Sequence, residues 1–197
     1  MTTARRRGVL SLAKPSSATL DALVREQRDE DLTYPQVGAT MAALPSGYWH
    51  GRHAVGLGEG PDVFRRACDG LRRWQAHGRA GVHVHPQWAE VEEGLTVVLA
   101  VPVVSLYVTV ACRVVAVTRE DARFGFAYGT LPHHLIEGEE AFFVERDDQD
   151  NVWFLITSFA RPRGRLARPV GPLVHALDQR IVQRYLRGLQ QHAAQEV

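Results

Sequence analysis

The sequence predicts an α+β fold in which a strongly curved antiparallel sheet grips a long C-terminal helix. From Gly81 to Ser158, apolar residues recur with a period of two and the links between the apolar runs are short, which is typical of an antiparallel meander. After this region, residues 171–191 repeat apolar side chains at helical spacing and form one broad apolar side. A sheet that wraps around the last helix would bury all of these faces.

Length and composition indicate one domain. The chain has 197 residues, of which 45% are hydrophobic, and this is enough for one well-buried core. We expect residues 1–17 to form a flexible leader, because they hold an arginine run and little apolar material. Residues 18–197 then form a single domain.

Charge and cysteine content exclude several classes of function. The net charge of +1 comes from 23 basic and 22 acidic residues spread along the chain, whereas nucleic-acid binding needs clustered basic residues. Cys68 and Cys112 lie far apart and resemble neither a disulfide framework nor a metal-ligand pair. The apolar run Gly8–Ala13 is too short for a signal peptide. We therefore expect a cytoplasmic protein without a nucleic-acid partner.

The first elements are a helix, a strand and a second helix. Leu20, Leu23 and Val24 recur at helical spacing after Thr19, which we expect to cap a short helix. A turn-rich passage then leads to a strand from Tyr48 to Leu57. The glycines that follow lack the lysine and hydroxyl of a phosphate-binding loop, so they predict a tight corner. An amphipathic helix should run from Pro61 to near Gly78.

The segment Leu95–Val117 is almost uncharged and must be distinguished from a membrane span. Its many β-branched residues, together with Pro102, favour buried strands meeting at a bend over a spanning helix. The candidate strands of the whole region are Val82–His85, Leu95–Val101, Val103–Thr109, Ala111–Thr118 and three more between Arg123 and Arg161.

Several short motifs resemble those of the bacterial and plant domain-of-unknown-function family DUF1990. They include Thr33-Tyr34-Pro35, Pro45-Ser46-Gly47-Tyr48, Gly58-Glu59-Gly60, Cys112-Arg113-Val114-Val115, Phe124 to Pro132, His134, Gly138-Glu139-Glu140 and Trp153-Phe154. The resemblance covers roughly residues 33–190 and implies an architecture but no reaction or ligand. The order of elements is also similar to the helix-grip fold of the START and birch-pollen-allergen superfamily. Members of that superfamily mostly hold apolar or amphipathic small molecules between the sheet and the last helix.

The densest polar group of the sequence lies between His133 and Glu140, close to Tyr128. In one interpretation, His134 and Glu139 form a proton-transfer pair and Tyr128 hydrogen-bonds a substrate oxygen. In the other, this is a turn whose glutamate caps backbone amides and whose histidine fixes the turn. No nucleophile or metal stands out beside the group, which favours the structural interpretation.

Ligand-binding residues are sought among the aromatic side chains and one arginine. Apolar pockets are lined by the same residue types as cores, so the sequence leaves the division between core and lining open. Arg113 either anchors a ligand carboxylate or phosphate, or keeps an exposed strand soluble. The candidates for ligand binding are Tyr107, Arg113, Phe126, Tyr128, Trp153 and Tyr185.

A metal or cofactor is not expected. His83 and His85 share one face of a strand and would need a third ligand such as His133. No carboxylate or cysteine stands at a recognisable ligand interval.

The sequence therefore leaves three functions open. The first is binding of a small hydrophobic or amphipathic molecule between sheet and helix. The second is a cofactor-independent cyclase, dehydratase or isomerase that uses His134, Glu139 and Tyr128 in the same cavity. The third is an interaction module that uses the basic face of the last helix.

Overall fold

The structure is a computed structural model that describes residues 9–163 and 171–195. Its elements in chain order are β1 (Leu10–Ser11), α1 (Ser17–Gln27), a short 3₁₀ helix (Ala39–Met41), β2 (Trp49–Glu59), α2 (Pro61–Arg72), α3 (Gln75–Arg79), β3 (His83–His85), β4 (Thr96–Val103), β5 (Leu106–Glu120), β6 (Arg123–Thr130), β7 (Ile136–Arg146), β8 (Asn151–Pro162) and α4 (Gly171–Ala193).

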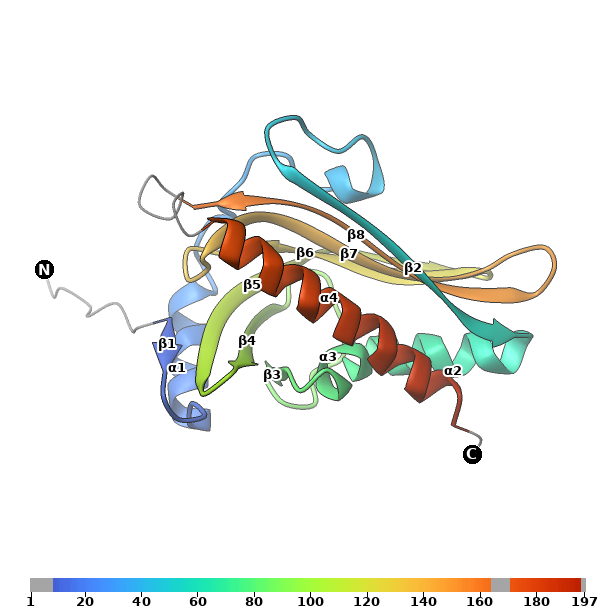
Figure 1. Ribbon diagram of the computed structural model, residues 1–197, viewed down its shortest axis with the longest axis horizontal. Coiled ribbons are helices and arrows are strands. Elements are labelled where there is room, and N and C mark those ends of the chain that lie inside the picture. The colour runs from blue at the N-terminus through green and yellow to red at the C-terminus, as the bar shows by residue number, and fades with distance from the viewer. Residues whose placement is uncertain (1–8, 164–170, 196–197) are drawn as a thin grey trace, which may run out of the picture.

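One antiparallel sheet organises the molecule. Its strands follow the order β2-β8-β7-β6-β5-β4-β3, and β1 pairs with β5 beyond the point where β6 ends. The sheet curves around α4, while α2 and α3 lie near the C-terminal end of that helix (Figure 1). The predicted helix-grip architecture is therefore confirmed.

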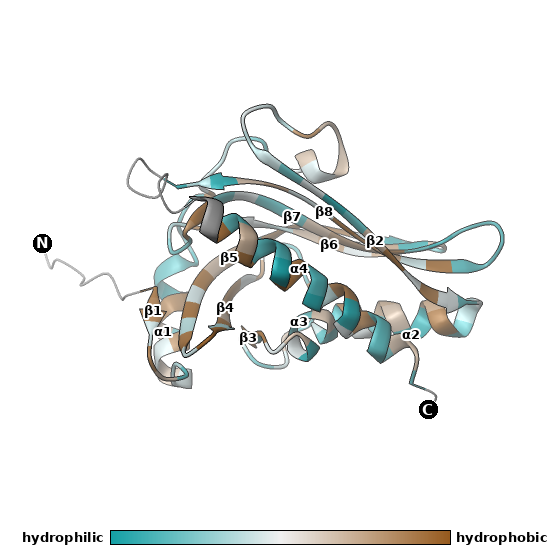
Figure 2. Cartoon of the chain, viewed as in Figure 1, coloured by the Kyte–Doolittle hydropathy of each residue, from teal (hydrophilic) through white to brown (hydrophobic). Residues whose placement is uncertain are grey.

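The main core lies between the concave face of the sheet and the helices α2, α3 and α4. Phe126, Phe142 and Phe154 project from neighbouring strands and are fully buried in the same cluster as Tyr185 and Leu189 of α4. Figure 2 shows hydrophobic and hydrophilic bands alternating along α4, as expected for a helix with one buried side. A smaller cluster holds α1 against the outer face of β4 and β5.

The predicted helix from Pro61 to Gly78 is in fact two helices. Trp74 separates them because its backbone is left-handed, with a φ of 58°. Its indole Nε1 donates to the carbonyl oxygen of Ala89 at 2.9 Å, and its ring packs on Phe126. These tertiary contacts stabilise a conformation that a residue with a Cβ rarely adopts.

The predicted strands Val103–Thr109 and Ala111–Thr118 are one strand, β5. The chain reverses at Val104–Ser105, where Val104 has a φ of 53°. Pro102 pairs with Tyr107 of β5 but has no partner on its other side, because β3 pairs only with residues 98–100, so β3 requires no N–H at that position. The prediction that Leu95–Val117 forms buried strands meeting at a bend is thus correct, although the bend lies after Pro102.

The start of the chain differs from the expected loose leader. Residues 1–8 lie outside the described residues, but Leu10 and Ser11 pair with Tyr107 and Val108. The first helix begins at Ser17 and is capped by Ser16, whose Oγ accepts from the Thr19 N–H at 3.3 Å. Thr19 is therefore the third helical residue and not the cap.

Candidate functional site

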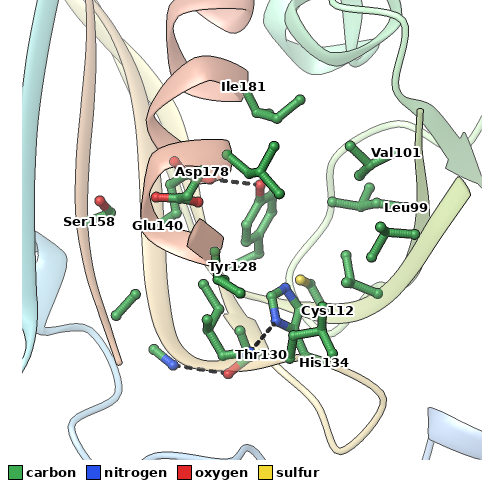
Figure 3. Close-up of a pocket in the computed structure, with 18 of the residues that line it drawn as sticks. Leu99, Val101, Cys112, Tyr128, Thr130, His134, Glu140, Ser158, Asp178 and Ile181 are labelled. Carbon is green, nitrogen blue, oxygen red and sulfur yellow. Dashed lines mark hydrogen bonds between the residues drawn. The ribbon is translucent and has the colours of Figure 1, made fainter. Parts of the chain in front are cut away.

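A cavity of about 160 Å³ lies between the concave face of the sheet and α4. Figure 3 shows Leu99 and Val101 on one side of it and Glu140, Asp178 and Ser158 on the other. Its apolar wall is formed by Leu99, Val101, Val103, Val108, Val110, Val174, Leu177 and Ile181. Its polar side chains are Cys112, Tyr128, Thr130, His134, Glu140, Ser158, Asp178 and Tyr185.

Strand register places three of the polar side chains in one row. Glu140 of β7 pairs with Ser158 of β8 and with Tyr128 of β6, so all three side chains leave the same face of the sheet. Asp178 reaches the cavity from α4. The polar row therefore meets the helix at one wall of an otherwise apolar space.

Tyr128 is held between a carboxylate and a buried histidine. Its Oη donates to Oε2 of Glu140 at 2.9 Å and lies 3.4 Å from Nε2 of His77. Burial lowers the pKa of His77 to about 3, so its ring is neutral. Because the Tyr128 hydrogen points to Glu140, Nε2 of His77 must be the nitrogen that carries the proton and donates to Oη. Nδ1 of His77 has no partner among the described residues.

Glu140 and Asp178 form a coupled pair of acids. Burial, and then the charge of Asp178, raises the pKa of Glu140 to about 8. Burial raises the pKa of Asp178 to about 6, and nearby His175 opposes this shift. Both side chains keep some accessible surface because they line the cavity, but protein atoms surround them. At pH 7 the pair thus retains a proton while it still carries negative charge.

His134 also faces the cavity. Its Nδ1 accepts from the Ile136 N–H at 3.1 Å, and burial lowers the pKa of the ring to about 3. The neutral ring must therefore carry its hydrogen on Nε2. Figure 3 shows this ring between Thr130 and Cys112, with Nε2 free of partners among the described residues.

Glu139 does not join His134. Although its backbone borders the cavity, its carboxylate lies on the outer face of β7 and accepts hydrogen bonds from Tyr34 Oη, Gly38 N, Thr40 N and Thr40 Oγ1. Consecutive strand residues point to opposite faces, so Glu140 and not Glu139 shares the cavity with His134. The predicted His134–Glu139 proton-transfer pair is absent for this reason.

Two of the predicted ligand-binding residues line the cavity, namely Tyr128 and Tyr185. Phe126 lies on the same face of the sheet but is fully buried against Trp74 and Phe142. It belongs to the core and not to the lining.

The other three candidates lie away from the cavity. Tyr107 points to the outer face of β5, where it packs with the α1 cluster and lies near His83. Arg113 shares that face, and its Nη2 donates to the carbonyl oxygens of Gln27 and Arg28 at 3.2 and 2.6 Å. Trp153 is 42% exposed on the outer side of β8. Because side chains alternate along a strand, all three lie on the outer face of the sheet and outside the proposed ligand site.

The histidines considered as metal ligands have other partners. His85 Nε2 lies 2.7 Å from Asp21 Oδ1, and His133 Nε2 lies 3.0 Å from Thr109 Oγ1. Residues 9–163 and 171–195 contain no cluster of three or more histidine, cysteine or acidic side chains that could hold a metal. Cys112 lines the cavity, and burial raises the pKa of its thiol well above the usual range, so its nucleophilic form is disfavoured.

Comparison with known proteins places this fold and cavity in a family. The sequence pattern of the domain of unknown function DUF1990 matches residues 33–188. The chain belongs to the DUF1990 family. A UPF0548 protein of Deinococcus radiodurans is 35% identical over 195 residues, which cover 90% of this chain and 96% of that protein. A UPF0548 protein of Arabidopsis thaliana is 33% identical over 112 residues, which cover 54% of each chain.

Solved structures similar to this DUF1990 protein share its fold at low sequence identity. A hypothetical protein of Helicobacter pylori has a TM-score of 0.56 and 16% identity, covering 83% of this chain and 96% of its own. Ara h 8.0201 has a TM-score of 0.52 and 8% identity, covering 75% and 98%. The ZhuI aromatase/cyclase of a Streptomyces species has a TM-score of 0.50 and 16% identity, covering 74% and 93%. These likenesses show the helix-grip fold alone.

The sequence prediction for this DUF1990 protein missed the residues that form the polar wall. Asp178 interrupts the apolar stripe that Val174, Leu177 and Ile181 form on α4, and an acid at such a position is a readable signal. Glu140 has the same parity as the core residue Phe142, which also places it inside. His77 carries no comparable signal, because its position depends on the left-handed backbone of Trp74.

Proposed function

We propose that this DUF1990 protein binds a small amphipathic molecule in the cavity between the sheet and α4. The observation that carries the proposal is the division of one cavity into an apolar wall and a polar wall. Transfer of the ligand's apolar part from water would supply most of the affinity. Tyr128, Tyr185, Glu140, Asp178 and His134 would orient its polar part.

The volume of the cavity limits the ligand. Pockets for drug-sized molecules usually measure about 300–1,000 Å³, whereas an apolar cavity of about 150 Å³ holds a benzene molecule. At about 160 Å³, this cavity suits a ligand of benzene size that carries one short polar substituent. A long lipid chain would require α4 to move away from the sheet.

Native mass spectrometry of the protein purified gently from its own organism tests the proposal. We expect a stoichiometric extra mass that is lost on denaturation. Leu177→Trp fills the cavity and should abolish the adduct, whereas Ala176→Trp alters the neighbouring exposed position on α4 and should retain it. Thermal melting of both variants verifies that they fold. Equal adduct occupancy in the two variants would place the ligand elsewhere.

A second candidate function is a cofactor-independent enzyme on the same cavity. The arrangement of Tyr128, Glu140 and Asp178 favours it, because an acid pair that retains a proton near pH 7 is suited to general acid–base catalysis. A cyclase, dehydratase or isomerase reaction fits this chemistry. His134 would supply a neutral donor, and Glu139 takes no part.

The enzyme is distinguished from the binder by what it releases. A metabolite extract incubated with wild-type protein should lose one compound and gain another, while Glu140→Gln should bind the first compound without converting it. Glu145→Gln on the outer face of β7 is the control. Recovery of the same unaltered ligand from wild type and Glu140→Gln would exclude the enzyme and retain the binder.

Cellular location rests on fewer observations. None of the helices among the described residues is long and apolar enough to cross a membrane. Cys68 and Cys112 are both buried and free, which supports the proposed cytoplasmic location.

A further inference from the structure

The acidic groups of the cavity have no basic counterpart among the residues that line it. Glu140 enters from β7 and Asp178 from α4, and no lysine or arginine belongs to the lining in the described parts of the chain. His175 of α4 lies outside the lining, lowers the pKa of Asp178 and packs its ring on Trp49 with 4.7 Å between the ring centroids. Two carboxylates thus face one small, mainly apolar space.

The two acids also have unused hydrogen-bond acceptors. Within the described parts of the chain, the Tyr128 hydroxyl is the one donor bound to Glu140, and Asp178 accepts no side-chain or backbone hydrogen bond. A carboxylate offers two oxygens with about four acceptor sites. The unused acceptor capacity calls for a ligand that brings donors.

Two kinds of partner can compensate for paired carboxylates in apolar surroundings. One is a proton, and the unliganded pair holds one because burial and mutual repulsion oppose full ionisation. The other is a cation. A metal ion is disfavoured because the described residues form no group of three or more ligands. An ammonium group needs no such set, and it brings up to three N–H donors.

We propose that the cavity binds a small primary amine with an apolar body, whose ammonium group lies between Glu140 and Asp178. The inference deepens the proposed ligand binding and rests on it. The body of the amine contacts Leu99 and Val101 on the opposite wall and Ile181 of α4. The rings of Tyr128 and Tyr185 lie beside the acid pair and add a cation–π contribution.

This arrangement selects among ligands of one shape. An alcohol of the same size offers one O–H donor and no charge, so it binds less tightly than the amine. A carboxylate of that size meets the negative charge that the acid pair still carries and is rejected.

Amine binding also releases a proton, because the ammonium group favours the ionised form of the acid pair. Polar groups from several elements surround Glu140 and Asp178. They are Cys112 of β5, Tyr128 of β6, His134 of the β6–β7 loop, Ser158 of β8, and His175 and Tyr185 of α4. Burial raises the pKa of Cys112, Tyr128 and Tyr185 and lowers that of His134, so these four stay neutral between pH 6 and 8. Among the described residues that line the cavity, the acid pair is therefore the source of the released proton.

Isothermal titration calorimetry with benzylamine, benzyl alcohol and benzoate tests the inference. At pH 7.5 we expect benzylamine to bind at least about tenfold more tightly than benzyl alcohol, and benzoate not to bind. Heats measured in two buffers of different ionisation enthalpy should reveal proton release with benzylamine and none with the alcohol. Glu140→Gln and Asp178→Asn should each remove the preference for the amine and retain alcohol binding. Glu145→Gln on the outer face should behave as wild type.

The outcomes separate this inference from the proposed function. Benzyl alcohol binding as tightly as benzylamine overturns the amine inference and leaves cavity binding intact. If no probe binds while the natural protein carries an adduct that Leu177→Trp removes, the amine inference is again overturned and the proposed function stands. If neither probes nor adduct are found, both fail.

Discussion

Glu139 fixes the segment before β2 to the outer face of the sheet. Its carboxylate accepts from Tyr34, Gly38 and Thr40, and its side chain is 3% exposed. Gly129 on the neighbouring strand makes this packing feasible, because a Cβ there would collide with the Tyr34 ring. Glu139 is therefore a structural residue, as the turn interpretation of the sequence allowed.

Removing the negative charge of Glu139 should destabilise the protein without affecting the cavity. In Glu139→Gln one carboxylate oxygen becomes an amide NH₂ group, so a hydrogen-bond donor faces the N–H or O–H donors that now bind the carboxylate at this buried site. We expect a loss of about 2–4 kcal/mol in the free energy of unfolding, measured by urea denaturation. Glu137→Gln breaks only a partly exposed ion pair with Arg161 and should cost less than about 1 kcal/mol. Similar losses in the two variants would contradict the structural role of Glu139.

At the scale of residues, the sequence predicted the location of the polar group but not its partners. Tyr128 and His134 do line the cavity. Because side chains alternate between the two faces of β7, the sequence could have predicted Glu140, and not Glu139, as the acid in the cavity. Asp178 could also have been found from the sequence, because it interrupts the apolar stripe of the last helix. Neutral His77 beneath Tyr128 depends on tertiary packing, which periodicity does not encode.

Arg113 joins two elements that are far apart in the sequence. Its guanidinium donates to the last carbonyl groups of α1 from the outer face of β5, where it satisfies acceptors that the helix itself leaves free. Neither of the two roles considered from the sequence, a ligand anchor or a solvated charge, describes it.

The Arg113→Gln variant should loosen α1 from the sheet. It removes charge-assisted hydrogen bonds and a cation at a helix C-terminus, which together contribute about 1–2 kcal/mol. Urea denaturation should show that loss, and hydrogen exchange should increase in residues 17–27 before it does in β5. Arg119→Gln changes an exposed arginine of the same strand and is the control. Unaltered exchange in α1 would show that the cap is energetically unimportant.

At the scale of elements, periodicity succeeded wherever a segment kept one pattern. It located α4 within two residues, together with the course of the strands β6 to β8. It failed where a single non-glycine residue adopts a left-handed backbone, as Trp74 does between α2 and α3 and Val104 does in the β4–β5 turn. Trp74 is stabilised in this conformation by neighbours that are distant in sequence, whereas Val104 is fully exposed and adopts it within a two-residue turn, so local propensity disfavours the conformation at both positions.

The whole molecule should show a pH-dependent stability that arises from its buried groups. The pKa of Glu140 rises from an ordinary 4.5 to about 8, so the folded state binds more protons than the unfolded state across that interval. Its contribution is therefore fully present at low pH and is lost as pH rises toward 8. His77 and His134 act in the opposite sense, because their pKa values fall from 6.5 to about 3 and stability is lost as pH falls through that interval.

These opposite slopes leave one window in which Glu140 acts alone among these three groups. Between about pH 7.5 and 8.5 both histidines are neutral in either state while Glu140 of the folded protein still loses its proton, so the midpoint of thermal unfolding should decrease as pH rises. The Glu140→Gln variant should abolish that decrease, whereas Glu145→Gln should retain it. A wild-type midpoint that is flat over this window would show that Glu140 is ionised in the folded protein.

Binding of an ammonium ligand should oppose the decrease of the unfolding midpoint with pH, which connects stability to the chemistry of the cavity. An ammonium ligand binds the ionised acid pair, so the stabilisation by saturating benzylamine grows with pH while that of the free protein declines. A neutral ligand such as benzyl alcohol leaves the protonated pair in place and shifts the midpoint by a similar amount at each pH. Thermal melting of the wild-type protein with each compound at about pH 7.5 and 8.5 therefore shows whether the polar wall exchanges its proton for a cation. Benzylamine and benzyl alcohol giving parallel shifts would mean that the pair keeps its proton when the cavity is filled.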